Sequence, residues 1–184
     1  MKLTSTAIAG VVIAETESRS DERGSFARLF CAQELRDIVG ERTISQINLS
    51  VTLQAGAVRG LHFQRHPHAE TKFIRCLRGK AWDVAVDLRS GSPTFLRWHA
   101  EELAPDNARM MIIPEGCAHG FQALSPNCEL LYLHTASYVP ESEGGVAWND
   151  PRVGISWPLP IPQNGGLSDR DRNLPILSAG FSGV

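Results

Sequence analysis

A succession of short strand-like segments is the feature that most constrains the fold of this chain. Seven segments alternate in polarity or are rich in β-branched residues: 46–51, 58–64, 71–77, 81–88, 110–114, 121–124 and 130–138. Turns containing Gly, Pro, Asn and Ser separate them. Because no helices alternate with these segments, they predict an all-β fold, an antiparallel sandwich or barrel of the jelly-roll type with a few short helices.

Two segments lie outside this series. Residues 32–39 predict a helix, since Leu35, Ile38 and Val39 share one face and Gly40 follows as a C-terminal stop. Residues 1–13 carry a single positive charge and an apolar-leaning stretch without a convincing cleavage site. We interpret them as a first strand rather than as a signal peptide.

The length of the chain favours one domain. The chain has 184 residues, of which 42% are hydrophobic. It is long enough to bury one sizeable core but too short for two domains of ordinary size. From about residue 139, prolines interrupt regular structure, while Trp148, Ile155 and Trp157 offer apolar anchors. We therefore expect residues 1–184 to form a single domain in which the tail, about residues 139–184, covers the barrel as loops and short helices.

Charge and cysteine usage exclude several classes of protein. A formal net charge of -2 and a pI near 6.3 provide no basic surface for nucleic acid, and the apolar runs are too short to span a membrane. The four cysteines have no C-x-x-C spacing, and their neighbours suit reduced, buried thiols. The sequence therefore predicts a cytoplasmic protein without nucleic-acid or membrane partners.

Three ionisable residues fall in predicted strands, where such side chains need a partner or a chemical role. They are Arg59 and His62 in one segment and Lys72, one of only three lysines, in the next. A regular strand would place Arg59 and His62 on opposite faces, but a bulge at Gly60 would turn both toward one cavity. These groups suit anion binding and proton transfer. The alternative for Lys72 is a side chain that snorkels from a strand edge.

Alternation along residues 130–138 brings polar rings together. Tyr132, His134 and Tyr138 share one face of a regular strand, together with Leu130 and Ala136. Two tyrosines and a histidine would then line one surface. The alternative for Tyr132 is a core aromatic whose hydroxyl is simply satisfied.

Eight short motifs occur in order along the chain: DERGSF (21–26), QIN (46–48), VRGLHFQ (58–64), VAVDLR (84–89), SPTF (92–95), PEGCAHGF (114–121), WNDP (148–151) and LSDRD (167–171). Through them the chain resembles the dTDP-4-dehydrorhamnose 3,5-epimerase family, cupin-like jelly-roll sugar-nucleotide epimerases, over nearly its whole length. The resemblance implies an epimerase that inverts C3, C5 or both of a nucleotide-linked 4-keto-6-deoxy sugar in rhamnose-type deoxysugar biosynthesis, with dTDP as the expected nucleotide.

The resemblance also assigns catalytic roles. His62 would remove the carbon-bound proton, and Asp171 would fix its tautomer and stabilise the imidazolium. Lys72 would offset the charge of the enolate, and Tyr132 would return a proton from the other face. No metal or other cofactor is needed. Asp169 lies close enough in the sequence to be mistaken for Asp171.

Further residues match the substrate pocket of the family. Arg59 would grip the diphosphate, while Arg23 and Phe26 would come from the neighbouring subunit. This implies a homodimer with shared active sites, and it allows strands within about residues 1–50 to exchange with the partner. His119 and Asp83 match a second buried pair that would line the cavity, bind the substrate by hydrogen bonds and tune its charge. The remaining members of the expected pocket are Gln46, Asn48, Tyr138 and Glu143.

Two residues depart from the family pattern and bear on the substrate. Arg28 stands where many members carry an acidic residue near the nucleotide base, and Glu70 stands where they often carry Gln, two residues before the lysine. Both changes alter charge, which can change nucleotide preference. A monofunctional 3- or 5-epimerase acting on another deoxysugar nucleotide is therefore an alternative.

Two other classes of protein fit part of this sequence pattern. A metal-dependent cupin, such as a dioxygenase or isomerase, would draw ligands from His62, His66, His68, Glu70 and His119, but their spacing is poor for a metal site. The proline between His66 and His68 also disfavours a regular strand. A sugar-nucleotide-binding protein without catalysis would have no need of the expected base, lysine and tyrosine.

Overall fold

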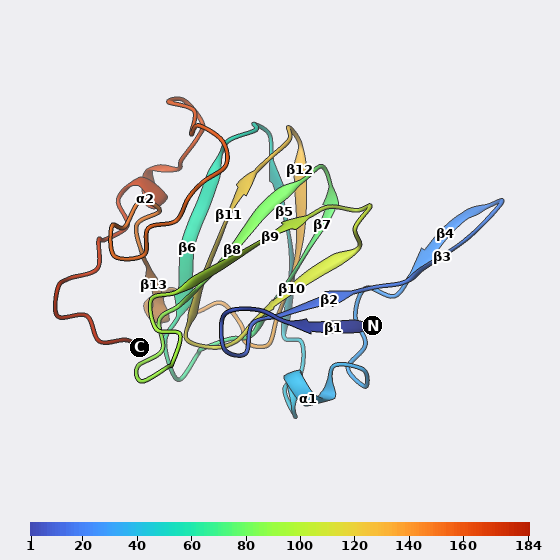
Figure 1. Cartoon of the computed structure of the whole chain (residues 1–184), viewed down its shortest axis with the longest axis horizontal. Coiled ribbons are helices and arrows are strands. Elements are labelled where there is room, and N and C mark those ends of the chain that lie inside the picture. Colours follow the sequence, from blue (N-terminus) through green and yellow to red (C-terminus); the bar gives the residue numbers. More distant parts are fainter.

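Two antiparallel sheets face one another in the computed structural model, which describes residues 1–184 (Figure 1). The six-stranded sheet has the order β1 (Lys2–Ser5), β2 (Val12–Glu15), β10 (Arg109–Ile113), β7 (Lys72–Arg78), β12 (Cys128–His134), β5 (Gln46–Thr52). The five-stranded sheet has the order β13 (Glu143–Gly145), β6 (Val58–Gln64), β11 (Cys117–Ala123), β8 (Ala81–Asp87), β9 (Trp98–Leu103). This arrangement confirms the predicted all-β jelly-roll class.

All seven predicted segments contain strands, with bounds that differ by a few residues. The last one was predicted too long, because β12 ends at His134 rather than at Tyr138. Strand β9 was not predicted. It lies at the edge of its sheet and is half-buried along most of its length, so its sequence lacks a clear alternation between apolar and polar residues.

A helix forms within the predicted segment 32–39, but it is shorter than predicted. Helix α1 spans only Arg36–Val39, and Leu35 at its N-terminus provides no side-chain hydrogen bond to cap it. Gly40 ends the helix with a φ of 62° and donates its N–H to the carbonyl of Arg36, as a C-terminal glycine stop does. Leu35 and Val39 are buried against Phe73 on the outer face of the six-stranded sheet.

Because side chains alternate along a strand, some apolar residues point into the space between the two sheets and others point outward, toward the segments that cover the sheets. Along β7, Ile74 and Cys76 join the cluster between the sheets, whereas Phe73 points outward to the segment around α1. Phe121 from β11 meets Ile74 and Leu130 in the interior cluster. Fully burying a side chain of this size stabilises the fold by about 1.5–3 kcal/mol, so the interior cluster fixes the distance between the two sheets.

The tail covers the outer face of the five-stranded sheet, as expected. After the turn η1 (Pro140–Ser142) and strand β13, loops lead to helix α2 (Asp169–Arg172). Val146 and Val153 are buried against this sheet, and Trp157 packs beside them and donates its indole N–H to the carbonyl of Trp148 at 2.9 Å. The loops therefore hold α2 beside strand β6.

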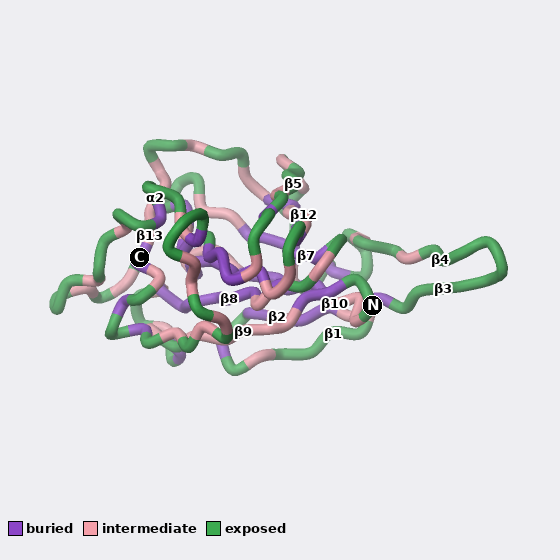
Figure 2. The backbone as a smooth tube through the Cα atoms, turned by 90° about the horizontal axis from the view of Figure 1, so that it is seen from above, coloured by how far each residue is buried: buried purple, intermediate pink, exposed green.

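The hairpin formed by β3 (Ser18–Asp21) and β4 (Gly24–Ala27) projects away from the two sheets (Figures 1 and 2). Every residue from Ser18 to Phe26 is exposed, and the side chain of Phe26 is 76% exposed. Strands β3 and β4 pair only with each other and join neither of the two large sheets.

No helix in the structure has the length and apolar character needed to cross a membrane. The four cysteines are free thiols, and three of them, Cys76, Cys117 and Cys128, are buried.

Candidate active site

A cavity of about 630 Å³ lies between the sheets at one end of the sandwich. The inner face of β12 runs from buried Leu130 through Tyr132 to His134, and the inner face of β7 runs from Cys76 to Lys72. The same strands therefore line an apolar core at one end and a polar cavity at the other. The volume is typical of a small-molecule site.

A β-bulge brings Arg59 and His62 to the cavity together. His62 pairs with His119 and Arg59 pairs with Phe121, so β6 carries one residue more than β11 between these two positions. Gly60 has a φ of 114°, and a Cβ there would lie 2.6 Å from the Cα of Gly120. Only glycine fits this position. The predicted bulge is confirmed, and both side chains line the cavity.

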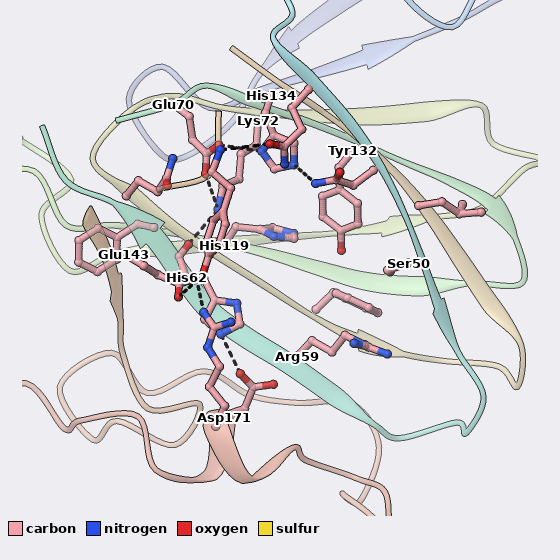
Figure 3. A pocket seen from close by; sticks show the side chains of 18 of the residues that line it. Ser50, Arg59, His62, Glu70, Lys72, His119, Tyr132, His134, Glu143 and Asp171 are labelled. Atoms are coloured by element: carbon pink, nitrogen blue, oxygen red, sulfur yellow. Dashed lines mark hydrogen bonds and ion pairs between the residues drawn. The ribbon is translucent and has the colours of Figure 1, made fainter. Parts of the chain in front are cut away.

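His62 is paired with Asp171, not with Asp169. The Nε2 of His62 lies 2.7 Å from Oδ1 of Asp171, which is buried, whereas Asp169 is exposed (Figure 3). Ser168 caps α2 by accepting the backbone N–H of Asp171 at 3.0 Å, and this orients the carboxylate toward the cavity.

Asp171 is held as a carboxylate. Burial alone would raise its pKa, but hydrogen bonds from His62, Ser168 and the backbone of Gly60 outweigh that effect and lower it. An ionised Asp171 accepts a hydrogen bond from Nε2–H of His62. The other nitrogen, Nδ1, is then left unprotonated and able to act as a base.

Lys72 is a cavity residue rather than a snorkelling edge residue. It is only 7% exposed, and its Nζ lies 3.3 Å from Oε1 of Glu70 and donates to the carbonyl of His62 at 3.2 Å. A buried ammonium in this position can stabilise negative charge that develops beside His62.

Tyr132 faces the cavity between two imidazole rings. Its ring centroid is 5.7 Å from that of His119 and 5.9 Å from that of His134. Burial raises the pKa of Tyr132, so the phenol keeps its proton at neutral pH. In Figure 3 the hydroxyl lies on the side of Ser50, whose Oγ is buried without a hydrogen-bond partner.

The predicted pairing of Asp83 with His119 is confirmed, but the predicted substrate contact by Asp83 is wrong. Asp83 is 0% exposed and lies behind His119, with its Oδ1 2.6 Å from Nε2 of that histidine. His119 itself lines the cavity, but β8 is a central strand and the ring of His119 covers the carboxylate. Burial raises the pKa of Asp83, and its Oδ2 has no partner. Asp83 can act only through His119.

The predicted pocket residues Gln46, Asn48, Tyr138 and Glu143 also line the cavity. Gln46 accepts the backbone N–H of Tyr138 at 3.1 Å, and the hydroxyl of Tyr138 donates to Glu143 at 3.1 Å. Asn48 lines the same wall as Gln46. Tyr138 belongs to a loop and is 49% exposed, so its place at the cavity does not come from the strand face from which it was predicted.

Arg59 is anchored at the far end of the cavity from Lys72 (Figure 3). It donates from Nε to Oγ1 of Thr52 at 3.0 Å and from Nη2 to the carbonyl of Val51 at 3.1 Å. These bonds leave Nη1 without a protein partner and orient the guanidinium for an anionic ligand. Glu70 lies with Lys72, so its extra negative charge is not beside Arg59.

Arg23 and Phe26 do not reach the cavity of their own chain. Both lie on the projecting hairpin, where Arg23 pairs with Asp21 at 2.5 Å. Arg28 follows β4 directly and pairs with Glu34 at 2.5 Å, at the base of the hairpin.

Sequence reasoning missed two features of the site. Glu70 and His134 form a pair at 2.8 Å beside Lys72, and Arg170 of helix α2 pairs with Glu143 at the rim. Strand alternation did place the ring of His134 on the same face as Tyr132, but it did not identify a partner for that ring. The partner, Glu70, precedes its strand and had no periodicity to mark it.

No group of three or more His, Cys, Asp or Glu side chains is arranged to hold a metal ion. His62 and His119 are each paired with a single aspartate, and His66 and His68 are exposed. The ligand set considered for a metal-dependent cupin is therefore not brought together.

Comparison with known proteins agrees with this geometry. The model of the dTDP-4-dehydrorhamnose 3,5-epimerase family matches residues 5–179. The dTDP-4-dehydrorhamnose 3,5-epimerase of Salmonella typhimurium is 42% identical over 179 residues, covering 96% of this chain and 96% of that protein.

Two crystal structures share the fold over nearly the whole chain. The dTDP-4-dehydrorhamnose 3,5-epimerase of Bacillus anthracis, with TDP and PPi bound, has a TM-score of 0.90 and 38% identity, covering 96% of this chain and 99% of that one. The 3,5-epimerase of Legionella pneumophila, in complex with dTDP-4-keto-L-rhamnose, has a TM-score of 0.88 and 37% identity, covering 95% and 92%. This chain belongs to the dTDP-4-dehydrorhamnose 3,5-epimerase family and is a deoxysugar epimerase.

Proposed function

We propose that the enzyme inverts both C3 and C5 of a dTDP-linked 4-keto-6-deoxy sugar by removing and returning a proton at each carbon. One observation carries this proposal. His62 and Tyr132 reach one cavity from different sheets, the imidazole from β6 and the phenol from β12 (Figure 3). Inversion needs a base on one face of the sugar and an acid on the other, and facing sheets can supply them.

The first step is removal of the proton next to the C4 ketone. Nδ1 of His62 takes the proton, because Nε2–H is committed to Asp171 at 2.7 Å. The electrons of the broken C–H bond move to the ketone oxygen and form an enolate. The ammonium of Lys72 offsets that charge, and Asp171 stabilises the imidazolium. The reaction needs no metal or other cofactor.

The second step is delivery of a proton to the opposite face. Tyr132 keeps its phenolic proton because burial raises its pKa. The proton moves to the carbon as the enolate electrons re-form the ketone, and the cavity mouth allows solvent to restore both His62 and Tyr132. His119, with Asp83 behind it, contacts the edge of the Tyr132 ring and binds the sugar from the same wall.

Arg59 would hold the diphosphate at the other end of the cavity. This fits the ligands of the relatives, since the Bacillus anthracis structure contains TDP and the Legionella pneumophila structure contains a dTDP-sugar. Gln46, Asn48, Tyr138 and Glu143 would contact the remaining parts of the substrate.

A homodimer with shared sites fits the exposed N-terminal hairpin. Arg23 and Phe26 lie on this hairpin, remote from the cavity of their own chain, so they can complete a site only in a second copy. Edge strand β5 also exposes a row of apolar side chains suited to a partner sheet, Ile47, Leu49 and Val51, and exposed Leu53 follows directly after the strand. A monomer that is fully active at nanomolar concentration in light scattering and kinetic assays would contradict the shared site.

A reducing, cytoplasmic location is supported by the thiols. Cys76 and Cys128 belong to the same interior cluster and are both free. In a protein of an oxidising compartment, neighbouring cysteines would be expected to form a disulfide.

The test of the reaction is incubation with dTDP-4-keto-6-deoxyglucose in deuterated water, followed by NMR at C3 and C5. We expect label at both carbons, with both configurations inverted. Label at one carbon would identify a monofunctional epimerase. No label would overturn the proposed reaction.

The test of the acid uses two tyrosine variants. Tyr132→Phe deletes only the hydroxyl and leaves His62 and Lys72 intact, so label should still enter the reacting carbon with configuration retained while inversion falls by orders of magnitude. Tyr138→Phe is the control and should mainly weaken substrate binding. Normal inversion in Tyr132→Phe together with its loss in Tyr138→Phe would make Tyr138 the acid.

A further inference from the structure

Beside the expected catalytic groups lies a buried pair that the proposed reaction does not use. The Nδ1 of His134 is 2.8 Å from Oε2 of Glu70, and the Nζ of Lys72 is 3.3 Å from the other oxygen of the same carboxylate (Figure 3). All three side chains are nearly buried and line the cavity. One carboxylate therefore holds two cavity groups at once.

The charge of Glu70 fixes the protonation pattern of His134. Burial alone would raise the pKa of Glu70, but the hydrogen bond from His134 and the charge of Lys72 outweigh it and lower the pKa. An ionised Glu70 can only accept in the hydrogen bond at 2.8 Å, so Nδ1 of His134 carries the proton and donates it to that bond. The opposite nitrogen, Nε2, is then an acceptor, and it lies 3.5 Å from Nδ2 of Asn48.

The ring of His134 also supports Tyr132. The two rings are two residues apart on the inner face of β12, with centroids 5.9 Å apart and planes inclined by 12°. His119 meets Tyr132 from another side, edge to face. Rotation of the Tyr132 ring is therefore limited on two sides, and one of those limits depends on the bond between Glu70 and His134.

We propose that Glu70 and His134 are positioning residues: Glu70 fixes the imidazole of His134, and that ring sets the position of the Tyr132 phenol by stacking and the orientation of the Asn48 amide by a hydrogen bond. The inference rests on the proposed role of Tyr132 as the acid. Neither residue exchanges protons with the substrate. A small displacement of an acid from the reacting carbon can cost about 100-fold in rate, so stacking on a fixed ring matters to inversion.

The first experiment separates the two tasks of His134. In deuterated water, the ratio of retained, labelled substrate to inverted product reports on Tyr132, because a loss of folded enzyme lowers both equally. His134→Ala removes the ring and should raise this ratio roughly 10- to 100-fold. His134→Phe keeps a stacking ring that Glu70 cannot fix, so the ratio should lie between the values of wild type and His134→Ala, while KM rises because the hydrogen bond to Asn48 is lost.

Variants of Glu70 provide the matched control. Glu70→Ala frees the imidazole and should raise the ratio in the direction of His134→Ala. Glu70→Gln retains an oxygen that can accept the hydrogen bond from Nδ1–H of His134, so its ratio should stay closer to the wild-type value than that of Glu70→Ala. An unchanged ratio in His134→Ala, with exchange and inversion reduced equally, would mean that the ring has only a structural role and would overturn the proposal.

A second measurement does not depend on the sugar substrate. Nitrogen NMR of the resting enzyme should show His134 as the neutral Nδ1–H tautomer, and Glu70→Ala should abolish that preference. An Nε2–H tautomer of His134 in the wild-type enzyme would contradict the hydrogen bond from Nδ1–H to Glu70, and so would overturn the proposal even if epimerisation proceeds. Absence of exchange in the wild-type enzyme, with the Nδ1–H tautomer present, would instead count against the proposed reaction and against the part of this inference that concerns Tyr132.

Discussion

The molecule contains two histidine–aspartate pairs with nearly the same geometry in two different surroundings. Nε2 of His62 lies 2.7 Å from Asp171, and Nε2 of His119 lies 2.6 Å from Asp83. The first pair joins strand β6 to helix α2 at the cavity rim. The second joins β11 to β8 in the centre of the five-stranded sheet.

The surroundings give the two carboxyls opposite properties. Hydrogen bonds to Asp171 lower its pKa, whereas burial raises the pKa of Asp83, which has one oxygen without a partner. Asp171 is therefore suited to stabilise a positive charge that appears on its histidine during turnover. Asp83 is suited to hold its histidine in place. The lesson is that the contact alone does not define a catalytic pair, because the other donors around the carboxylate decide its charge.

The largest effect should come from His62→Ala. Without the imidazole no base faces the reacting carbon, so exchange and inversion should both fall below detection. Binding of dTDP, measured by calorimetry, should stay close to wild type because Arg59 lies elsewhere in the cavity. The same substitution at His119 should leave measurable exchange. Near wild-type turnover in His62→Ala would show that the comparison assigns the base to the wrong pair.

A smaller but severe effect is expected for Asp171→Asn. The amide cannot stabilise the imidazolium of His62, so kcat should fall by about 10²–10⁴-fold, the range attributed to general acid–base assistance. KM should change little, since Asp171 contacts His62 rather than the diphosphate end of the cavity. Single-turnover kinetics would check this, and a loss confined to KM would contradict it.

Asp83→Asn should be milder than Asp171→Asn. The amide oxygen can still accept a hydrogen bond from the N–H of His119. The substitution therefore alters one hydrogen bond, and kcat/KM should fall roughly tenfold or less. Steady-state kinetics of the two asparagine variants, measured side by side, provides the comparison. Equal losses would mean that both pairs take part in proton transfer.

The smallest effect concerns the pH dependence of stability, where the two variants should differ in sign. Asp171, with a lowered pKa, contributes stability above its ordinary pKa of 3.8 that is lost as the pH falls through its folded-state value. Asp83, with a raised pKa, contributes stability below 3.8 that is lost as the pH rises through its folded-state value.

Urea unfolding across this range would test that difference in sign. Relative to wild type, Asp171→Asn should lose free energy of unfolding as the pH rises toward 3.8, whereas Asp83→Asn should gain it as the pH rises above 3.8. Both changes should amount to about 1 kcal/mol. Parallel curves for the two variants would mean that the surroundings of the two carboxyls do not differ in the way described.

The fold could be predicted largely because the inner strands are short, rich in apolar residues and separated by turn residues. Strands β6 and β7 are buried over most of their length, and their limits were nearly right. Half-buried edge strands have no such pattern, which is why β9 was missed. Helix α1 was overestimated because its apolar face persists beyond the residues that form helical hydrogen bonds.

The candidate site was predicted in part for a different reason. His62, Lys72 and Tyr132 stand out as polar groups on inward positions, and Gly60 signalled the bulge that turns Arg59 inward. The partnership of Asp171 came only from the family resemblance, since a polar stretch in a tail has no periodicity. Glu70 and His134 are 64 residues apart, and only the pairing of β7 with β12 brings them together.

The chain has only two tyrosines, and both of them line the cavity. Every phenol signal of the protein therefore originates at the site, without background from the rest of the fold. Burial raises the pKa of both phenols, strongly for Tyr132 and less for Tyr138, which is 49% exposed and donates its hydroxyl to Glu143. An alkaline difference spectrum thus reports on the solvent-facing rim of the cavity, through Tyr138, before it reports on the interior, with no label introduced.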